Sequence, residues 1–117
     1  MTQIAMVAGE TSGDLLAGLL LDGLQERWPD LHSMGIGGPQ MGQRGFEAWW
    51  PHDKLSVHGF GWEVLRRYRE IVGIRTQLRD RLLVNQPDVF IGVDAPDFNL
   101  DLEFSLKQLG IKTVHFV

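Results

Sequence analysis

The 117-residue sequence contains no cysteine. That absence excludes a disulfide-stabilised scaffold and any metal site built from thiolate ligands. An excess of positive charge is also lacking, because 11 Lys and Arg against 15 Asp and Glu leave a net charge of −4. Binding to nucleic acid through an overall basic surface is therefore not expected.

Long hydrophobic runs are missing as well. The longest nearly apolar stretch, residues 15–21, is far shorter than the roughly 20 residues that a membrane-spanning helix needs. Residues 1–8 contain no basic segment, and their apolar run is too short for a signal peptide. We find no internal repeat and no low-complexity segment. These absences predict one compact domain located in the cytoplasm.

What the chain does contain is an alternation of short apolar runs with helical patterns. Residues 4–8 and 89–93 are continuous apolar runs, which are typical of strands buried on both faces. Apolar spacing predicts three helices: one that ends before Pro29, one over residues 64–83 and one over residues 100–109. Further strands are predicted over residues 33–36, 45–51 and 111–117. The alternation predicts an α/β fold with a doubly wound, Rossmann-like parallel sheet.

Three local expectations accompany this pattern. Residues 37–39, Gly-Gly-Pro, are expected to interrupt regular structure. In the helix over 64–83, an unbroken course would place Arg75 and Arg79 inside the apolar arc, so a kink or break near Gly73 is expected. Residues 113–117 form an apolar strand without a following turn, and we therefore expect the chain to be the front part of a longer polypeptide.

The first candidate site is the polar glycine loop over residues 9–14, between the first strand and the first helix. Free backbone N–H groups and the helix dipole favour an anion or a polar ligand at such a position. The loop matches neither the dinucleotide fingerprint nor the P-loop. Its alternative is a structural turn in which Ser12 or Asp14 caps the helix, and position alone favours that alternative.

The second candidate site, residues 92–99, follows the central strand at its carboxyl end, where open α/β sheets bind ligands. Partial desolvation is expected to raise the pKa of Asp94, which would suit it to act as a general base. Asp97 and Asn99 fit equally well as caps of the next helix, with Pro96 at its entry. No histidine or third carboxylate has metal-ligand spacing around these aspartates, so no metal is predicted.

Positive charge is concentrated over residues 66–81, where six arginines and two acidic residues give +4 within a chain of −4. Such a segment can lie on an anionic membrane surface. The commoner arrangement is a core-packed helix with a solvated arginine face. Nucleic acid binding is disfavoured because the aromatic residues do not alternate with the arginines. The residues expected to face lipid are Val64, Leu65, Tyr68, Ile71 and Val72.

The remaining candidates for chemistry are weaker. The scattered histidines and the tryptophan pair are expected to be surface or packed residues, namely His32, His52, His58, His115, Trp49 and Trp50. A noncatalytic receiver-like or nucleotide-binding module is the alternative function. A receiver needs a pair of acids after its first strand and a phosphorylatable aspartate at a mid-chain strand end. Here the first strand is followed by Gly9 and Glu10, and residues 50–55 look irregular.

Four segments, in the same order along the chain, resemble the N-terminal part of the lipid-A-disaccharide synthase family. Members of that family are inverting glycosyltransferases of the GT-B type, with two Rossmann-like domains. The segments are VAGETSGD (residues 7–14), GIGGPQM (35–41), GVDAPDFN (92–99) and GIKTVHFV (110–117). The resemblance runs nearly end to end. One departure lies over residues 57–63, which are a residue longer than the usual segment and contain the unusual Gly61 and Trp62.

The resemblance implies the reaction. A diacylglucosamine passes from its UDP-linked donor to diacylglucosamine 1-phosphate at the inner-membrane surface, without metal or other cofactor, and Asp94 is the implied base. It also favours the membrane interpretation of residues 64–83. A second domain, absent here, is expected to hold most of the UDP-sugar site, and a homo-oligomer is possible for the full-length protein. The implied substrate-binding residues are Gly9, Glu10, Ser12, Gly13, Glu63, Asp97 and Asn99.

Overall fold

The computed structural model describes residues 2–57 and 61–116. Within that part of the chain, a five-stranded parallel sheet has the order β3-β2-β1-β4-β5. The strands are β1 (Gln3–Ala8), β2 (His32–Gly37), β3 (Glu47–Pro51), β4 (Val89–Val93) and β5 (Thr113–Phe116). All five were predicted from the sequence, although the last residue of the expected fifth strand, Val117, lies outside the described residues.

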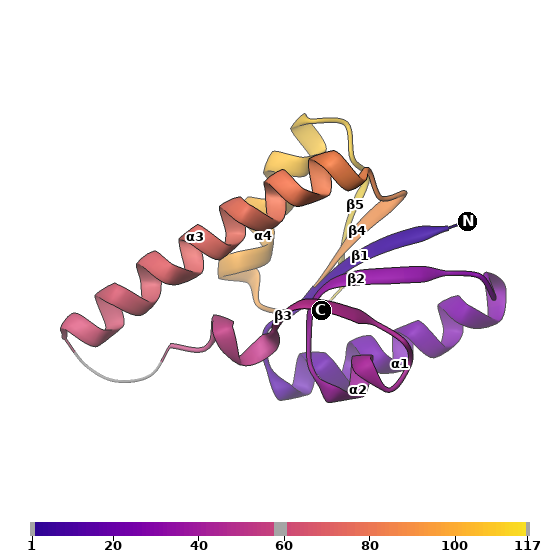
Figure 1. The fold of residues 1–117 in the computed structure, drawn as a ribbon, viewed down its shortest axis with the longest axis horizontal. Helices are drawn as coiled ribbons and strands as arrows, with labels where there is room; N and C mark the ends of the chain where they lie inside the picture. Colours follow the sequence, from indigo (N-terminus) through magenta and orange to yellow (C-terminus); the bar gives the residue numbers. More distant parts are fainter. Residues whose placement is uncertain (1, 58–60, 117) are drawn as a thin grey trace.

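Helices cover both faces of the sheet (Figure 1). One face carries α1 (Thr11–Arg27) and the short α2 (Pro39–Gly42), and the other carries α3 (Trp62–Asn85) and α4 (Pro96–Gln108). A 3-10 turn, η1 (His52–Leu55), follows β3. The central strands are apolar in continuous runs because each buries side chains on both faces. The doubly wound α/β fold is therefore confirmed.

The strand order separates this fold from the receiver-like alternative. Receivers follow the flavodoxin-like order 2-1-3-4-5, whereas 3-2-1-4-5 is the Rossmann order. The chain leaves β1 toward β2 on one side and later reaches β4 on the other. The carboxyl ends of β1 and β4 therefore form the switch point at which such sheets bind ligands.

Two expectations about helices are wrong, and the first concerns residues 37–39. The helix α2 begins directly after Gly38, because the buried carboxylate of Asp14 accepts hydrogen bonds from the backbone N–H groups of Gly38, Gln40 and Met41 at 3.0, 2.9 and 3.0 Å. A side chain 24 to 27 residues away thus supplies the cap that the local sequence lacks. Asp14 caps α2 rather than α1, whose own N-cap residue, Glu10, makes no side-chain cap bond.

The second wrong expectation is the break near Gly73, because α3 continues unbroken through that position. Its buried stripe consists of Ile71, Ile74, Leu78 and Leu82. Arg75 lies beside this stripe without entering the core, because its guanidinium reaches α4 instead. An unbroken helix is therefore compatible with the arginine spacing.

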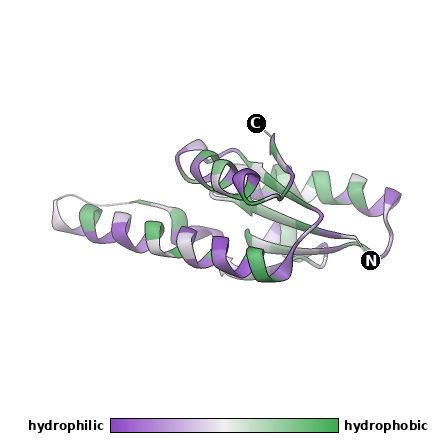
Figure 2. Cartoon of the chain, turned by 90° about the horizontal axis from the view of Figure 1, so that it is seen from above, coloured by the Kyte–Doolittle hydropathy of each residue, from purple (hydrophilic) through white to green (hydrophobic). Residues whose placement is uncertain are grey.

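The N-terminal half of α3 extends past the sheet and the other helices (Figures 1 and 2). Its N-cap is Gly61, with φ 66° and ψ −126°, a conformation that strains any residue with a Cβ. The unusual glycine found in the sequence is thus explained by the start of this helix. Residues 58–60 of the same segment, including His58, lie outside the described residues. Among residues 2–57 and 61–116, no helix combines the length and the apolar character needed to span a membrane.

Candidate active site at the carboxyl edge of the sheet

The two sequence segments predicted to carry chemistry leave neighbouring strands at one edge. Ala8 and Val93 are register partners, so Gly9 and Asp94 follow them side by side. The backbone of Gly9 is in close contact with the β4–α4 turn, because a Cβ on Gly9 would lie 3.1 Å from the Cβ of Ala95. The structure therefore brings the first loop and the Asp94 segment together.

A groove of about 500 Å³ opens beside these two segments, between α3 and α4. Its lining is amphipathic. The apolar side chains come from η1, the chain after it, α3 and α4, and are Leu55, Val57, Tyr68, Ile71, Val72 and Phe98. The polar and backbone part is formed by Gly9, Glu10, Arg75, Ala95, Pro96, Asp97 and Asp101. A ligand with both an apolar chain and a polar head matches such a lining.

Asp94 lies immediately before the groove-lining Ala95 and is exposed. The partial burial that the sequence predicted for the Asp94 side chain is therefore absent. Its backbone has φ 54° and that of Ala95 has φ 43°, both left-handed for residues with a Cβ. The turn is held on both sides, since Asp94 N donates to Phe116 O at 2.8 Å and Asn99 Nδ2 donates to Asp94 O at 2.8 Å. An exposed carboxylate on a fixed turn is available to a bound substrate.

Of the other predicted residues in the Asp94 segment, some line the groove and one is buried in the core. Asp97 lines the groove, but no side chain caps α4, whose N-cap residue is Ala95, so the predicted capping role is wrong. Asn99 is fully buried, and its amide also donates to Val7 O at 3.3 Å. Asn99 is therefore not the helix cap that was predicted: its amide ties β1 to the Asp94 turn. Pro96 occupies the first turn of α4, as predicted.

The first loop divides in the same way. Gly9 and Glu10 line the groove. Gly13 is buried in the first turn of α1, where its Cα packs near Ala8 and Val93 O, so it serves helix packing. Ser12 is exposed and, within the part of the chain that the structure describes, is not among the residues lining this groove.

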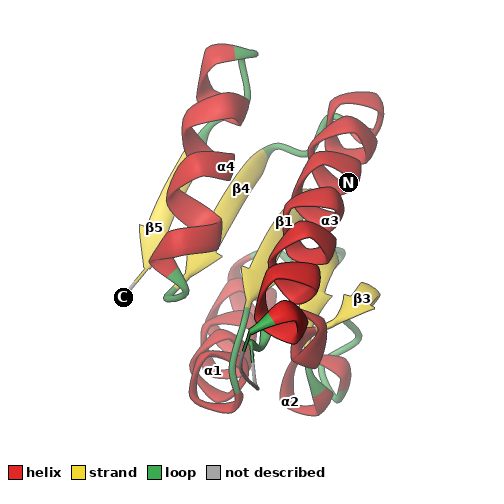
Figure 3. Cartoon of the chain, turned by 90° about the vertical axis from the view of Figure 1, so that its left-hand side faces the viewer, coloured by secondary structure: helices red, strands yellow, loops and turns green. Residues whose placement is uncertain are grey.

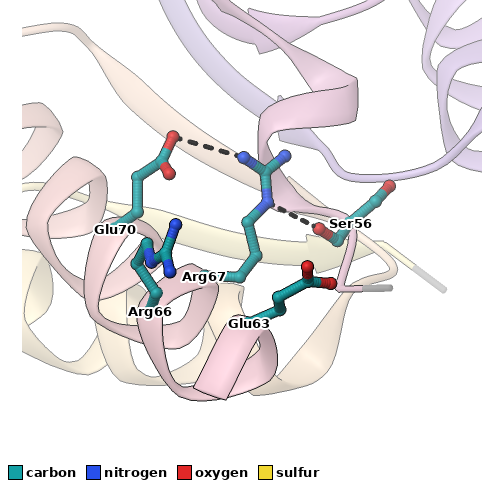
Figure 4. Close-up of a pocket in the computed structure, with 5 residues that line it drawn as sticks. All are labelled: Ser56, Glu63, Arg66, Arg67 and Glu70. Atoms are coloured by element: carbon teal, nitrogen blue, oxygen red, sulfur yellow. Dashed lines mark hydrogen bonds and ion pairs between the residues drawn. The ribbon is translucent and has the colours of Figure 1, made fainter. Parts of the chain in front are cut away.

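Glu63 belongs to a different hollow, at the start of α3 (Figure 4). The centre of that hollow is Arg67, which donates to Ser56 O at 2.9 Å, to Asp53 O at 2.7 Å and to Glu70 Oε1 at 3.2 Å. These bonds attach the chain around η1 to α3. Glu63 lines this hollow and not the groove beside Asp94, so the structure does not support the predicted grouping of Glu63 with Gly9 and Glu10.

Arg75 is a groove residue that the sequence analysis missed. Its Nη1 lies 3.3 Å from Asp97 O and 3.4 Å from Asp101 Oδ2, and its guanidinium lies 6.0 Å from the centre of the Phe98 ring. The guanidinium is thus paired with the Asp101 carboxylate and joins α3 to α4 across the groove. The signal in the sequence was the misfit of Arg75 with the apolar arc, which was interpreted as a helix break.

The predicted lipid-facing arc is only partly exposed. Leu65 and Tyr68 are 43% and 59% exposed, and Trp62 before them is 81% exposed. Ile71 is buried in the core between α3, α4 and the sheet, so its assignment to the membrane side is wrong. Val64 and Val72 are half-buried, and Val72 lines the groove. The exposed part of this arc therefore lies on the projecting end of α3.

Among residues 2–57 and 61–116, no cluster of three or more histidine, aspartate or glutamate side chains has the arrangement of a metal site. Glu103 and His115 do form a close pair, with 2.8 Å between Oε2 and Nδ1. His32 and His52 do not line the groove.

The sheet order and the groove at the switch point define a Rossmann-like α/β unit of the kind found in the N-terminal part of GT-B glycosyltransferases. A UGT transferase from Siraitia grosvenorii, solved in complex with UDP, matches the whole chain with a TM-score of 0.60 at 14% identity, over 28% of its own length. The family profile described as lipid-A-disaccharide synthetase matches residues 4–117, and the chain belongs to that family.

Curated relatives agree with the family assignment. The lipid-A-disaccharide synthases of Albidiferax ferrireducens and Verminephrobacter eiseniae are 80% and 61% identical over 115 residues, which is 98% of this chain. In both cases the aligned part is 30% of the relative. The chain therefore spans about 30% of the length of these curated relatives.

Proposed function

We propose that residues 1–117 form the acceptor-side, N-terminal part of a longer glycosyltransferase that makes the lipid A disaccharide. The donor is a UDP-linked diacylglucosamine and the acceptor is diacylglucosamine 1-phosphate, as the family resemblance implies. The observation that carries the proposal is the amphipathic groove at the switch point, bordered by Gly9 and Ala95 and adjacent to Asp94. Its apolar wall suits an acyl chain, and its polar side suits a sugar head group.

In the proposed reaction, Asp94 is the general base. The acceptor hydroxyl attacks the anomeric carbon of the donor sugar while the Asp94 carboxylate takes the hydroxyl proton. The bond from that carbon to the UDP oxygen breaks, and UDP leaves with the electron pair. The fixed turn supports this role, because a base must be held within hydrogen-bond reach of the proton that it abstracts. The donor contacts belong to the proposed second domain.

The product assay tests the proposed function. The full-length protein is incubated with the two lipid substrates, and UDP and disaccharide are measured separately. We expect one UDP for each disaccharide, and no UDP release when the acceptor is omitted. UDP release without disaccharide, or no reaction with either lipid, would contradict the proposal.

We further propose that the projecting end of α3 lies on the cytoplasmic surface of the inner membrane. Trp62, Leu65 and Tyr68 supply exposed apolar surface, and a shallow hollow between Trp62 and Leu65 is bordered by Arg66 and Arg69. Both arginines are exposed and have no ion-pair partner among the described residues. Apolar side chains beside unpaired cations suit an anionic lipid surface.

The double variant Arg66→Gln, Arg69→Gln is expected to weaken binding to vesicles containing anionic lipid by roughly 30-fold, since each arginine contributes about 1 kcal/mol at such a surface. Co-sedimentation at low salt measures the effect, and raising the ionic strength should diminish binding of the unaltered protein. The matched control is Arg79→Gln, Arg81→Gln, near the other end of the same helix, where Arg79 contacts Asp80 and Arg81 stacks on Trp49. Equal losses in both double variants would argue against a localised membrane surface.

A further inference from the structure

Helix α4 turns two polar side chains toward the sheet. As whole residues, Asn99 is 0% exposed and Glu103 is 8% exposed. They lie one helical turn apart, among the buried apolar residues Phe98, Leu102 and Leu106. Figure 3 shows α4 lying over β4 and β5, the strands that these side chains meet. Burying a carboxylate is costly unless a partner compensates the lost hydration. The pair Asn99 and Glu103 is therefore not explained by packing alone.

The partner of Glu103 is His115 on β5. Oε2 and Nδ1 lie 2.8 Å apart, and the two side chains are 11% and 24% exposed. Since an ionised carboxylate only accepts hydrogen bonds, Nδ1 donates, and the bond fixes the orientation of the imidazole ring. Among the hydrogen bonds of the described residues, this is the side-chain bond that joins α4 to β5.

Gly92 makes the contact possible. It is the register partner of His115, and a Cβ on Gly92 would overlap Glu103 Oε2. The carboxylate therefore rests directly on the backbone of β4, beside the imidazole. The three residues come from β4, α4 and β5, and each depends on the other two.

This arrangement lies next to the Asp94 turn. Gly92 is two residues before Asp94, and the residue after His115 supplies the carbonyl that accepts the Asp94 N–H bond. Left-handed conformations at two successive residues with Cβ atoms persist only where surrounding contacts impose them. A bond that fixes β5 against α4 therefore acts on the position of Asp94 through the Phe116 carbonyl.

We propose that Glu103 and His115, packed over Gly92, are positioning residues that hold β5 against α4 and thereby keep the Asp94–Ala95 turn in its left-handed conformation. His115 acts through Nδ1 and Glu103. Its Nε2 has no part in the chemistry. The kinetic consequence rests on the proposed function, whereas the structural consequence does not.

The test compares two substitutions of one residue in the full-length enzyme. His115→Asn keeps a donor near the position of Nδ1, and His115→Gln moves the donor toward the position of Nε2. We expect His115→Gln to lower kcat by roughly 10- to 100-fold with little change in KM, because misplacing a reactive group lowers the rate of chemistry more than binding. His115→Asn should stay within about threefold of the parent enzyme.

Hydrogen exchange followed by mass spectrometry measures how well the backbone of the Asp94–Ala95 turn is protected, and it needs no assay of activity. Peptides covering residues 94–99 should exchange faster in His115→Gln than in the parent, and His115→Asn should resemble the parent. Gly92→Ala, whose Cβ would overlap Glu103 Oε2 and lie 2.9 Å from Asn99 Cβ, should lower kcat and speed exchange at least as much as His115→Gln.

Several results would overturn the proposal. A loss of kcat in His115→Asn equal to or greater than that in His115→Gln would mean that a donor at the position of Nδ1 is not what the enzyme needs, and unchanged exchange over residues 94–99 in all variants would mean that the pair does not hold the turn. If the full-length protein proved inactive on the two lipids, the proposed function would fail while the exchange comparison still decided this inference. If His115→Gln did not fold, parent-like kinetics and exchange in Gly92→Ala would contradict the proposal.

Discussion

In the full-length enzyme, Asp94→Asn is expected to lower kcat by roughly 10²- to 10⁴-fold while KM for both substrates stays nearly unchanged. Asparagine keeps the size of the side chain and its hydrogen-bonding capacity but removes the oxygen that accepts the proton. Because Asp94 is exposed, the substitution leaves no buried group unpaired and should not unfold the protein. Initial rates at varied acceptor concentration measure the effect.

The control is Asp80→Asn, an exposed aspartate on α3 that pairs only with the neighbouring Arg79 among the described residues. It removes the same charge at a distance from the carboxyl edge, and its turnover should equal that of the parent enzyme. Near-normal turnover in Asp94→Asn would move the role of base to another residue, with Glu10 as the next candidate because it lines the groove.

The isolated 117-residue chain is expected to form no disaccharide, which is the largest effect that we predict. In the proposed function the groove binds the acceptor and Asp94 is the base, but a transfer between two Rossmann-like domains also needs donor contacts from the other domain. The same product assay measures this, with protein concentrations raised far above those used for the full-length enzyme. Far-UV circular dichroism should still indicate a folded α/β protein.

Turnover by the isolated chain, with UDP release matching the disaccharide formed, would contradict this expectation. It would place the donor site on residues 1–117 and remove the need for a second domain. Loss of the circular dichroism signal would instead show that the chain needs the rest of the protein in order to fold.

The sequence predicted the sheet well because its strands carry an unambiguous signal. Residues 4–8 and 89–93 are apolar without interruption, a pattern typical of short strands buried on both faces. The position of the Asp94 segment at the carboxyl edge follows from the same reasoning. The apolar runs thus predicted that the Asp94 segment lies at the carboxyl edge of the sheet.

What the sequence could not predict depends on contacts between distant residues. The helix α2 starts at Pro39 because of the carboxylate of Asp14, and no local pattern contains that bond. Arg75 appeared to disrupt an apolar arc, whereas in the structure it contacts α4 across the groove. Asparagine is a residue type common at helix caps and ligand sites, but the burial of Asn99 follows from how α4 packs on the sheet. In each case tertiary packing overrides the local signal.

In the proposed function, the groove between α3 and α4 binds the lipid acceptor. The most direct measurement uses a diacylglucosamine 1-phosphate that carries a photoreactive diazirine on one acyl chain, with crosslinked peptides of the full-length enzyme identified by mass spectrometry. We predict crosslinks within residues 68–75 and 95–101, where Tyr68, Val72 and Phe98 line the groove, and their loss on adding unlabelled acceptor. Acceptor-sensitive crosslinks confined to α1 or β3, with none in these two segments, would contradict the account.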